Sequence, residues 1–516
     1  MSAPADVALH SDDQIRYDRQ LWWLVYVVMV GGGLMIAAFA RSRITEPFLG
    51  LSLAVLVVLV MSWTYRPRAT LYITVFLTAI SDIATVSWFP FVKNLSSRES
   101  ISYVADALTI SPLDITLIVG FAVTTVTHYA RTGRLVDPSP LTLPILVVTM
   151  FVVLGFARGV VLSGGDLRVA VLEARPLFYL LLVFSIAVNV CRSPAHLRTA
   201  LWWVLAGVFV QTLLSIAYYG QLDQGQKDAL ESLNEHGSTL GHNLIIVTAL
   251  GLVLLPARAG LARAALLVAL VPTVFVVLIA ERRAGIASLS IGIVMLLIVL
   301  FWRHRRRFWF VAPAVIILTV GYLGVFWNNQ GTVGFPAQAV KSVIVPGAAT
   351  EADQNSDLYR QIEAFDVNFT IKSDPLLGIG FGRPFYRPVP LPDIAVFELN
   401  PYVPHNSVLW FWLKTGFFGF AAMFYLFARI IVLGARRLRT MNDGVDVVVT
   451  QSALLYAVMF LVYTYVDVSW DARNMVFLGL AAAICAQALP ARSPAGPPPR
   501  EAVDVSDPTT AATAST

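Results

Sequence analysis

The stretch Leu399–Phe420, with the sequence LNPYVPHNSVLWFWLKTGFFGF, passes from a polar loop directly into an apolar segment. His405 and Asn406 stand at the junction, directly after Pro404. An apolar segment of this kind is typical of a helix that enters a bilayer, because about 20 apolar residues are needed to cross one. The stretch therefore places an ionisable ring and an amide at a membrane surface, after the longest polar segment of the chain.

The composition of the whole chain agrees with a membrane protein. Of the 516 residues, 57% are hydrophobic and only 13% are charged, which is too apolar for a soluble domain. The two cysteines, Cys191 and Cys485, lie in or beside apolar runs and show neither a disulfide framework nor a zinc-ligand spacing. The net charge of +5 comes from scattered arginine clusters, so it does not indicate nucleic-acid binding. These features predict an all-α polytopic transmembrane protein.

The apolar segments predict 12–14 spans, if about 20 residues cross the bilayer each time. The candidate segments, about fourteen in number, lie at 21–40, 47–63, 69–90, 112–130, 141–162, 169–190, 199–219, 239–256, 264–280, 284–302, 308–327, 407–434, 449–467 and 472–489. Ser81 and Asp82 interrupt the third segment. The chain then divides into an N-terminal tail at 1–20, a transmembrane bundle at 21–327, a large loop at 328–405, C-terminal transmembrane helices at 406–489 and a disordered tail at 490–516.

The arginines between the segments predict the orientation of the chain. With a cytoplasmic N-terminus, every inside loop carries a basic pair or better, as the positive-inside rule requires. These arginines are Arg66 and Arg68, Arg131 and Arg134, Arg192 and Arg198, Arg258 and Arg263, Arg303 with Arg305, Arg306 and Arg307, and Arg436, Arg437 and Arg439. The reversed orientation would violate the rule at nearly every loop. Both tails are therefore predicted to be cytoplasmic and the large loop extracytoplasmic.

Within the large loop, the sequence NSDLYRQIEAFDVNFTIKSDP predicts a helix. Its apolar residues recur at helical spacing on one face, which comprises Leu358, Ile362, Phe365 and Phe369. Arg360 lies opposite this face, where it is either a site residue or a solvated surface arginine. The sequence PLLGIGFGRPF follows, and its alternate glycines allow a backbone to turn sharply or to approach another group closely.

Three further arginines are candidates for substrate binding. Arg282 and Arg283 lie between two apolar segments on the predicted outer side, where arginines break the positive-inside rule. They either extend to lipid phosphates or clamp an anionic substrate, since guanidinium groups match phosphate geometry. Arg175 stands in the outer half of the sixth segment, after Glu173. An intramembrane charge indicates function by default, with a structural pairing of Glu173 and Arg175 to neighbours as the alternative.

His405 is the candidate general base. A neutral histidine at a membrane rim can take a proton from a hydroxyl, and its ordinary pKa suits that task. An interfacial histidine that binds lipid headgroups is the alternative, and Asn406 or Ser407 can cap the helix that follows. We predict no metal site, because His236 and His242 lack a third ligand at a firm spacing.

Two carboxylates on the last predicted outer turn have simpler interpretations. Asp467 and Asp471 lie in the sequence VDVSWDARN, between the last two apolar segments. Carboxylates in such a turn either cap helices or pair with a nearby cation, here Arg473. We therefore assign them structural roles.

Three stretches resemble the O-antigen ligase/polymerase family, a group of polytopic glycosyltransferases that use polyprenyl-diphosphate-linked glycans. PHNSVLWFWLKTGFFG is similar to the family's Pro-His-Asn, Leu and Gly-x-x-Gly pattern, and YRQIEAFDVNFTIKSDPLLGIGFGRPF to its Arg-led loop helix with Pro-Leu-x-Gly-x-Gly-x-G. ERRAGIASL is similar to the family's Ser-Arg-Gly-Ala turn, with Arg283 at the matching place. The chain departs from this pattern at Arg282, where the family has a small polar residue.

The resemblance implies a role for each candidate residue. His405 would meet the acceptor sugar with Asn406 beside it, while the arginines Arg175, Arg282 and Arg283 hold the donor diphosphate and Arg360 closes the site from above. The implied reaction transfers a glycan from a polyprenyl diphosphate to an acceptor hydroxyl, at the outer face of the bacterial cytoplasmic membrane, in surface polysaccharide assembly. Arginines can stabilise the diphosphate leaving group without a metal or another cofactor. The implied partners are the lipid-linked donor, a glycan or lipid-linked acceptor and membrane lipids, with no nucleic acid.

Two other functions stay open. A transporter or flippase of lipid-linked saccharides often shows inverted repeats and charges at mid-membrane, whereas here the charges lie at the outer rim and no repeat is visible. A non-catalytic scaffold that presents the loop would not need His405, Arg283 and Arg175 on one side. Within the enzyme class, the sequence does not distinguish a ligase from a polymerase.

Overall fold

The computed structural model describes residues 46–487 apart from short gaps. The gaps are residues 83, 87, 88, 90, 99, 101, 102, 104, 105, 107, 229–231, 258, 346–350 and 392–398. The first predicted span at 21–40, both tails and Arg258 therefore lie outside the described residues.

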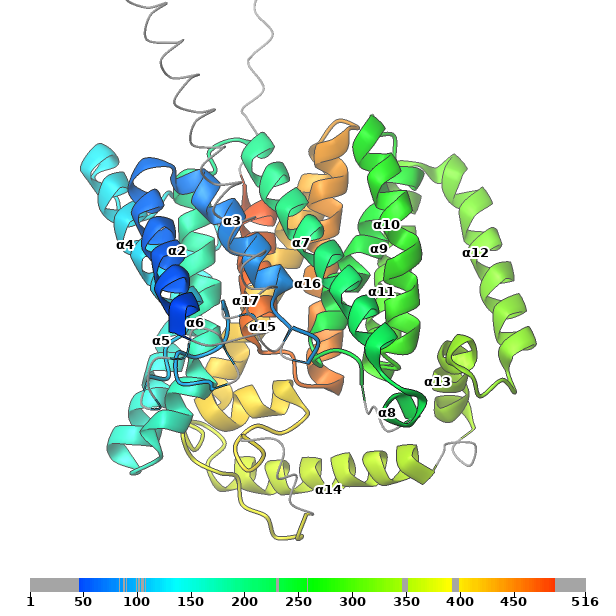
Figure 1. The fold of residues 1–516 in the computed structure, drawn as a ribbon. Helices are drawn as coiled ribbons and strands as arrows, with labels where there is room; N and C mark the ends of the chain where they lie inside the picture. Colours follow the sequence, from blue (N-terminus) through cyan, green and yellow to red (C-terminus); the bar gives the residue numbers. More distant parts are fainter. Residues whose placement is uncertain are drawn as a thin grey trace, which may run out of the picture.

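The described part of the chain is helical, without strands (Figure 1). In order, the elements are α2 (Glu46–Tyr65), α3 (Pro67–Ile80), α4 (Pro112–Thr132), α5 (Thr142–Phe156), the π-helix η1 (Ala157–Leu162), α6 (Leu167–Val190), α7 (Pro194–Gln221), α8 (Gln224–Asp228), α9 (Ser238–Leu254), α10 (Gly260–Ile279), α11 (Arg283–Arg303), α12 (Arg305–Phe326), the 3-10 helix η2 (Thr332–Gly334), α13 (Phe335–Ile344), α14 (Glu351–Ser373), α15 (Ser407–Thr440), α16 (Val445–Val466) and α17 (Ala472–Ala486).

The helices confirm the predicted class of all-α polytopic membrane protein. Within the described ranges, nine helices are long and apolar enough to cross a membrane, namely α4, α5 continued by η1, α6, α7, α10, α11, α12, α15 and α16. Shorter apolar helices accompany them at Leu56–Tyr65 in α2 and in α3, α9 and α17. The third predicted segment, at 69–90, is too long, because α3 ends at Ile80. Asp82 ends it by accepting hydrogen bonds from the backbone N–H groups of Ala84 and Thr85.

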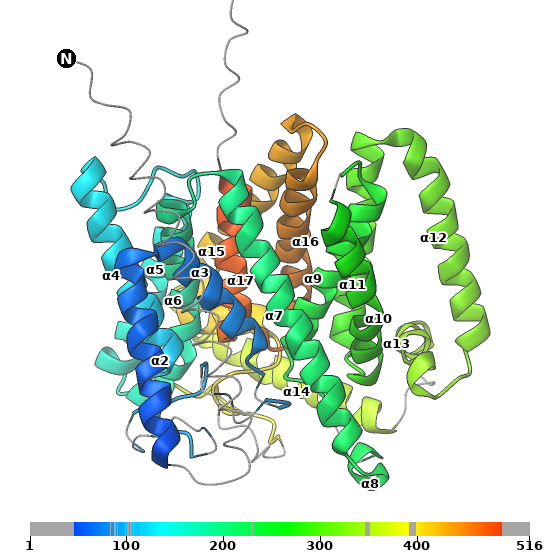
Figure 2. The ribbon, with the colours of Figure 1, turned by 45° about the horizontal axis from the view of Figure 1, so that its top comes forward.

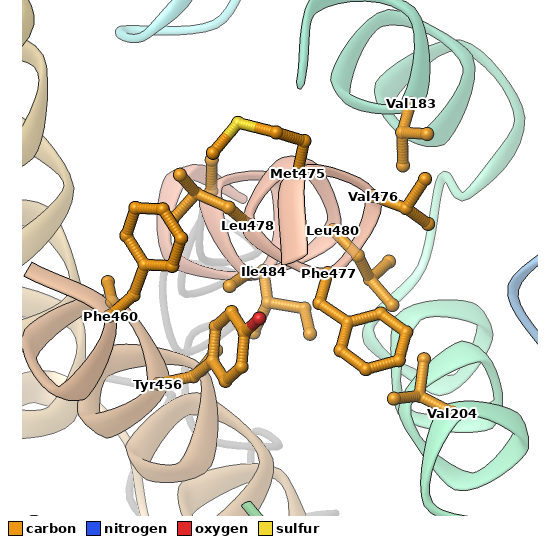
Figure 3. Packing of buried hydrophobic residues seen from close by; sticks show 14 of the residues in the cluster. Val183, Val204, Tyr456, Phe460, Met475, Val476, Phe477, Leu478, Leu480 and Ile484 are labelled. Carbon is orange, nitrogen blue, oxygen red and sulfur yellow. The ribbon is translucent and has the colours of Figure 1, made fainter. Parts of the chain in front are cut away.

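The helix α17 forms the centre of the bundle. All of its residues are buried, and it packs against α6, α7, α15 and α16. Figure 3 shows Val476 facing Val183 of α6, while Phe477 lies near Val204 of α7 and Tyr456 of α16 stands on another side. Burial on all sides explains why α17 is apolar around its whole circumference, since a helix with one wet side would be amphipathic.

The loop elements gather at one end of the bundle (Figures 1 and 2). There α14 lies across the helix ends, and α8 and α13 lie near the same level. The turn 467–471 between α16 and α17 reaches this end too, because His236, ahead of α9, contacts Asp467 there. We call this end, with α8, α14 and the turn 467–471, the loop-bearing end. It carries the candidate residues, and the predicted orientation would place it outside the cell.

Candidate functional site

The helix α14 buries a face of mixed polarity. Of the apolar residues predicted to share one helical face, Leu358, Phe365 and Phe369 are 55%, 56% and 49% exposed. Glu363 and Asp366 are buried instead, at 2% and 0% exposure. Val367 and Ile371 are buried too, at 0% and 6% exposure, and they pack with Leu413. The buried face of α14 therefore combines apolar residues with carboxylates that have hydrogen-bond partners.

His405 is held in place by Glu363. Its backbone N–H donates to Glu363 Oε2 at 2.8 Å, and its ring Nδ1 lies 3.1 Å from the same oxygen. The Glu363 side chain is only 3% exposed, whereas that of His405 is 24% exposed. With Nδ1–H donating to the carboxylate, Nε2 carries the free lone pair, as in a general base oriented by an acid. The ring also meets the edge of Tyr359, with the ring centroids 5.7 Å apart.

Glu363 was not among the residues predicted for the site. The available signal was its position three residues after Arg360 on the predicted loop helix, which places both on the same side. A carboxylate on a loop helix has no visible partner in the sequence, because His405 lies 42 residues further along the chain. Only the folded chain brings the two together.

Asp467 is the centre of a second charged group. It follows α16, its side chain is 2% exposed, and His236 Nδ1 lies 3.1 Å from its carboxylate. Burial by itself raises the pKa of Asp467, but the hydrogen bond from His236 and the charges of His236, Arg360 and Arg282 lower it to about 2. The carboxylate is therefore ionised at neutral pH, and the positive charges of both arginines favour that form.

The two carboxylates of the turn 467–471 have different roles in the structure. Asp471 caps α17 by accepting from the backbone N–H of Asn474 at 2.8 Å, as predicted. Asp467 pairs with His236 instead of Arg473. Arg473 pairs with Glu235 at 3.2 Å and Asp82 at 3.6 Å, so the start of α17 is joined to the residues after α3 and to the segment before α9.

Arg282 and Arg283 point to different partners at the start of α11. Arg282 donates from Nε to Ser232 Oγ at 2.8 Å. Arg283 donates through both terminal nitrogens to Asp357 of α14, at 2.8 and 3.2 Å. The two-pronged arrangement predicted for a phosphate is thus made with a carboxylate. The exposed fractions, 23% for Arg283 and 44% for Asp357, leave this pair open to solvent.

Arg360 lies between these groups on α14. Its charge acts on Asp467, and its Nε is buried without a hydrogen-bond partner among the described residues. The structure therefore places His405, Arg360, Arg282 and Arg283 along α14, where Glu363 contacts His405, Asp357 contacts Arg283, and Asp467 feels the charges of Arg282 and Arg360. We call this set the α14 row.

Arg175 lies apart from the α14 row. It donates to Asn94 Oδ1 at 2.6 Å and to the carbonyl of Thr109 at 2.9 Å, and it pairs with Asp114 at 3.3 Å. It lines a cavity of about 540 Å³ that we call the site cavity. The charged residues that line the site cavity are Asp82, Lys93, Arg168, Glu173, Arg175, Glu235, Asp471 and Arg473. Neither His405 nor the three other predicted arginines line it, so the site comprises two adjoining parts instead of one shared cavity.

Two short segments separate the site cavity from the α14 row. Val403 and Ser407, on either side of His405, line the cavity, and so does Val468, directly after Asp467. The Ser407 hydroxyl donates to the Asp467 carbonyl at 3.2 Å, which ties the two segments together. A group bound in the site cavity would therefore contact the two segments that carry His405 and Asp467.

The capping prediction for the start of α15 is confirmed for Asn406. Its side-chain oxygen accepts from the backbone N–H groups of Val408 and Leu409, at 3.1 and 3.0 Å. The cap fixes where the helix begins and so sets the position of His405, one residue earlier. Contact between Asn406 and a substrate stays a prediction.

The glycine-rich segment is anchored to the membrane helices. Gly378, Gly380 and Gly382 all have positive φ, at 68°, 84° and 76°, which residues with a Cβ rarely adopt. The N–H of Gly382 donates to Glu173 at 2.6 Å, and Glu173 pairs with Lys414 of α15 at 2.9 Å, with both side chains 0% exposed. Glu173 thus has structural partners, as the alternative interpretation proposed, although Arg175 is not one of them.

Metal ligands are not grouped in the part of the chain that the structure describes. No set of three or more His, Cys, Asp or Glu side chains is placed there to hold an ion. The cations of the α14 row and of the site cavity are arginines and a lysine. Charge stabilisation at this end can therefore come from guanidinium groups.

A comparison with protein families identifies the middle of the chain. A family model described as O-antigen ligase matches residues 265–424, a range that includes the α14 row except for Asp467. This match confirms the resemblance seen in the three motifs, and it supports an O-antigen ligase or polymerase type of role in polysaccharide biosynthesis. Arg175 and the other residues of α6 lie outside the matched range. A comparison with curated proteins finds no match.

Proposed function

Because the chain is similar to O-antigen ligases over the α14 row, we propose that it is a glycosyltransferase working at the outer face of the bacterial cytoplasmic membrane. It transfers a glycan from a polyprenyl-diphosphate carrier to an acceptor hydroxyl. The observation that carries this proposal is the half-buried His405 with Nδ1 against the buried Glu363. A base so oriented, beside several arginines, suits a displacement that releases a diphosphate.

His405 acts on the acceptor. Its Nε2 takes the proton of the acceptor hydroxyl, and Glu363 stabilises the imidazolium that forms. The acceptor oxygen attacks the anomeric carbon, whose bond to the diphosphate oxygen breaks. The products are the lengthened or attached glycan and the free polyprenyl diphosphate, and the proton leaves His405 to water.

The arginines act on the leaving group. Arg283 already holds the carboxylate of Asp357 in a two-pronged contact, which is the geometry that a phosphate oxygen pair would need. Donor binding exchanges Asp357 for the diphosphate, an exchange favoured by the openness of this pair. Arg282 and Arg360 add positive charge near the same end, and Arg175 contributes from the site cavity.

The proposal requires no metal. Arginine side chains neutralise the negative charge that develops on the leaving oxygen, which is the task that a divalent cation performs in many phosphoryl-transfer enzymes. The donor's polyprenyl chain stays in the bilayer and reaches the site between apolar helices.

The deciding experiment uses purified protein in proteoliposomes with a polyprenyl-diphosphate glycan donor and a hydroxyl acceptor. The expected result is a glycan product on gels, formed by the wild-type protein. Donor that crosses the bilayer without transfer of its glycan would contradict the proposal and indicate a flippase.

A second experiment assigns the acceptor. In cells that lack the protein, loss of a ladder of glycan lengths would indicate a polymerase. Accumulation of full-length lipid-linked glycan would indicate a ligase. Glycan that stays on the cytoplasmic side would contradict both and support transport.

A further inference from the structure

A second cavity lies at the opposite end of the bundle from the α14 row. It has a volume of about 710 Å³ and is lined by the junction of α2 and α3, the last turns of α4, the end of α6 and the start of α7. The rise along α6 from Arg175 to Val190, which lines this cavity, is about 22 Å, most of the hydrocarbon thickness of a bilayer. This second cavity, which we call the basic cavity, therefore lies at the other membrane surface.

The basic cavity holds unbalanced positive charge. Its lining includes Arg66, Arg68, Arg131 and Arg192, and no Asp or Glu. Arg68 contacts His196 Nε2 at 2.7 Å. The other three arginines make no side-chain hydrogen bond or ion pair with any residue that the structure describes. In the α14 row, by contrast, Glu363, Asp467 and Asp357 stand beside the cations.

Two buried side chains of the basic cavity have ring nitrogens that lack hydrogen-bond partners among the described residues. Trp63 is 0% exposed, and its indole Nε1 has no hydrogen-bond partner. His128 is 3% exposed, and its Nδ1 has none either, although its Nε2 lies 3.3 Å from Asp137. Buried polar atoms are normally hydrogen-bonded, so these two side chains leave polar groups unsatisfied in the wall behind the arginines. The unpaired arginines themselves match an oxyanion such as a phosphate.

The surroundings of the basic cavity indicate that the phosphate belongs to a lipid. The neighbouring faces of α2 and α4 are apolar and exposed, with Val57 at 58%, Met61 at 56%, Ile118 at 58% and Val126 at 67%. A free anion needs no such faces, whereas the acyl chains of a phospholipid would cover them. We propose that the basic cavity binds the headgroup phosphate of an anionic phospholipid, with its chains along α2 and α4.

Native mass spectrometry of the detergent-solubilised full chain tests this proposal. The protein is titrated with phosphatidylglycerol and with phosphatidylcholine of the same acyl chains. We expect one phosphatidylglycerol molecule to bind at least about tenfold more tightly than phosphatidylcholine, because a zwitterionic headgroup brings its own cation into the basic cavity. Equal affinities for the two lipids in the wild-type protein would overturn the proposal, whatever the variants do.

Substitutions locate the bound lipid. Arg66→Gln, Arg131→Gln and Arg192→Gln should each weaken phosphatidylglycerol binding about fivefold, and the triple substitution about 100-fold. The matched control is Arg134→Gln with Arg306→Gln, since both arginines are exposed at the same end and do not line the basic cavity. Unchanged affinity in the three single variants, or an equal loss in the control, would overturn the proposal. The single variants keep this test valid if the triple variant does not fold.

Glycerol phosphate distinguishes the two sources of the phosphate. It carries the same headgroup chemistry without acyl chains, so we expect it to displace bound phosphatidylglycerol only at concentrations at least about 100-fold higher than the lipid's own. Displacement at equal concentrations would show a site for a soluble phosphate and would overturn the assignment to a lipid.

Discussion

Two ion pairs near the candidate site differ in their access to solvent. Glu173 and Lys414 join α6 to α15 at 2.9 Å beneath the glycine-rich segment, and both side chains are 0% exposed. Arg283 and Asp357 join α11 to α14 at 2.8 Å, and they are 23% and 44% exposed. We call the buried pair of Glu173 and Lys414 the closed pair, and the partly exposed pair of Arg283 and Asp357 the open pair.

The difference in exposure decides what each pair can do. A buried charge that loses its partner stays in a medium that solvates it poorly, so the closed pair is held together by the cost of separating it. An exposed pair contributes only about 0–1 kcal/mol, since water and other ions replace either partner at little cost. The closed pair therefore positions the glycine-rich segment, while the open pair can exchange its carboxylate for a substrate phosphate.

The largest effect is expected from breaking the closed pair, because it threatens the folded protein itself. Lys414→Met should lower the free energy of unfolding by about 3–5 kcal/mol, since Glu173 is left buried without its counter-charge. Thermal unfolding in detergent measures this change. The double variant Glu173→Gln with Lys414→Met should recover part of the loss, because Gln leaves no buried charge and its one amide oxygen still accepts from Gly382 or from Trp410. Wild-type stability in Lys414→Met would show that the pair does not anchor this region.

The next effect concerns the base of the α14 row. His405→Ala should reduce transfer in proteoliposomes about 10²- to 10⁴-fold, the usual contribution of a general base, while expression and membrane insertion persist. Glu363→Gln should reduce it less, because the amide still orients the ring without stabilising its charge. Near-normal transfer by His405→Ala would remove the general-base role and leave orientation of the substrates as the source of catalysis.

Exchange of one cation for another tests the open pair. Arg283→Lys keeps the charge but loses the two-pronged contact, so transfer should fall about 10- to 100-fold, or about 1.4–2.7 kcal/mol of transition-state stabilisation. Arg282→Lys is the matched comparison, since Arg282 contacts Ser232 instead of Asp357, and its loss should be smaller. A large loss only in Arg282→Lys would assign the diphosphate to the neighbouring arginine. Full activity in both variants would show that neither arginine at this turn binds the diphosphate through a two-pronged contact.

A smaller change should follow from freeing Arg283. Asp357→Asn removes the carboxylate that competes with the diphosphate, so KM for the donor should fall by up to about fivefold with kcat nearly constant. Steady-state kinetics in proteoliposomes separates the two constants. A raised KM would show instead that Asp357 positions Arg283 for the donor and that the exchange does not occur.

The smallest effect is expected from chelation. Transfer should proceed unchanged in EDTA, because the arginines supply the positive charge at the leaving group. Loss of transfer that is restored by magnesium would contradict this prediction and direct attention to the carboxylates of the site cavity.

Local features of the sequence were sufficient for the class of protein and for the position of the motifs. The length of an apolar run and the placement of arginines in the loops are properties of neighbouring residues, so spans such as 112–130 and 407–434 correspond closely to α4 and to the start of α15. The cap at Asn406 and the turns at the alternate glycines follow from side-chain chemistry at single positions, which is why they could be predicted as well.

Only the tertiary structure decided which charges become partners. Glu363 with His405, Asp357 with Arg283 and Glu173 with Lys414 are separated by 42, 74 and 241 residues along the chain, and no local pattern relates them. The same reason explains the buried face of α14, since a helical pattern alone does not determine which surface the helix covers. In the folded chain His405 lies beside Glu363, while Leu413 lies beside Val367 and Ile371, so this face buries a carboxylate with its partner as well as apolar residues.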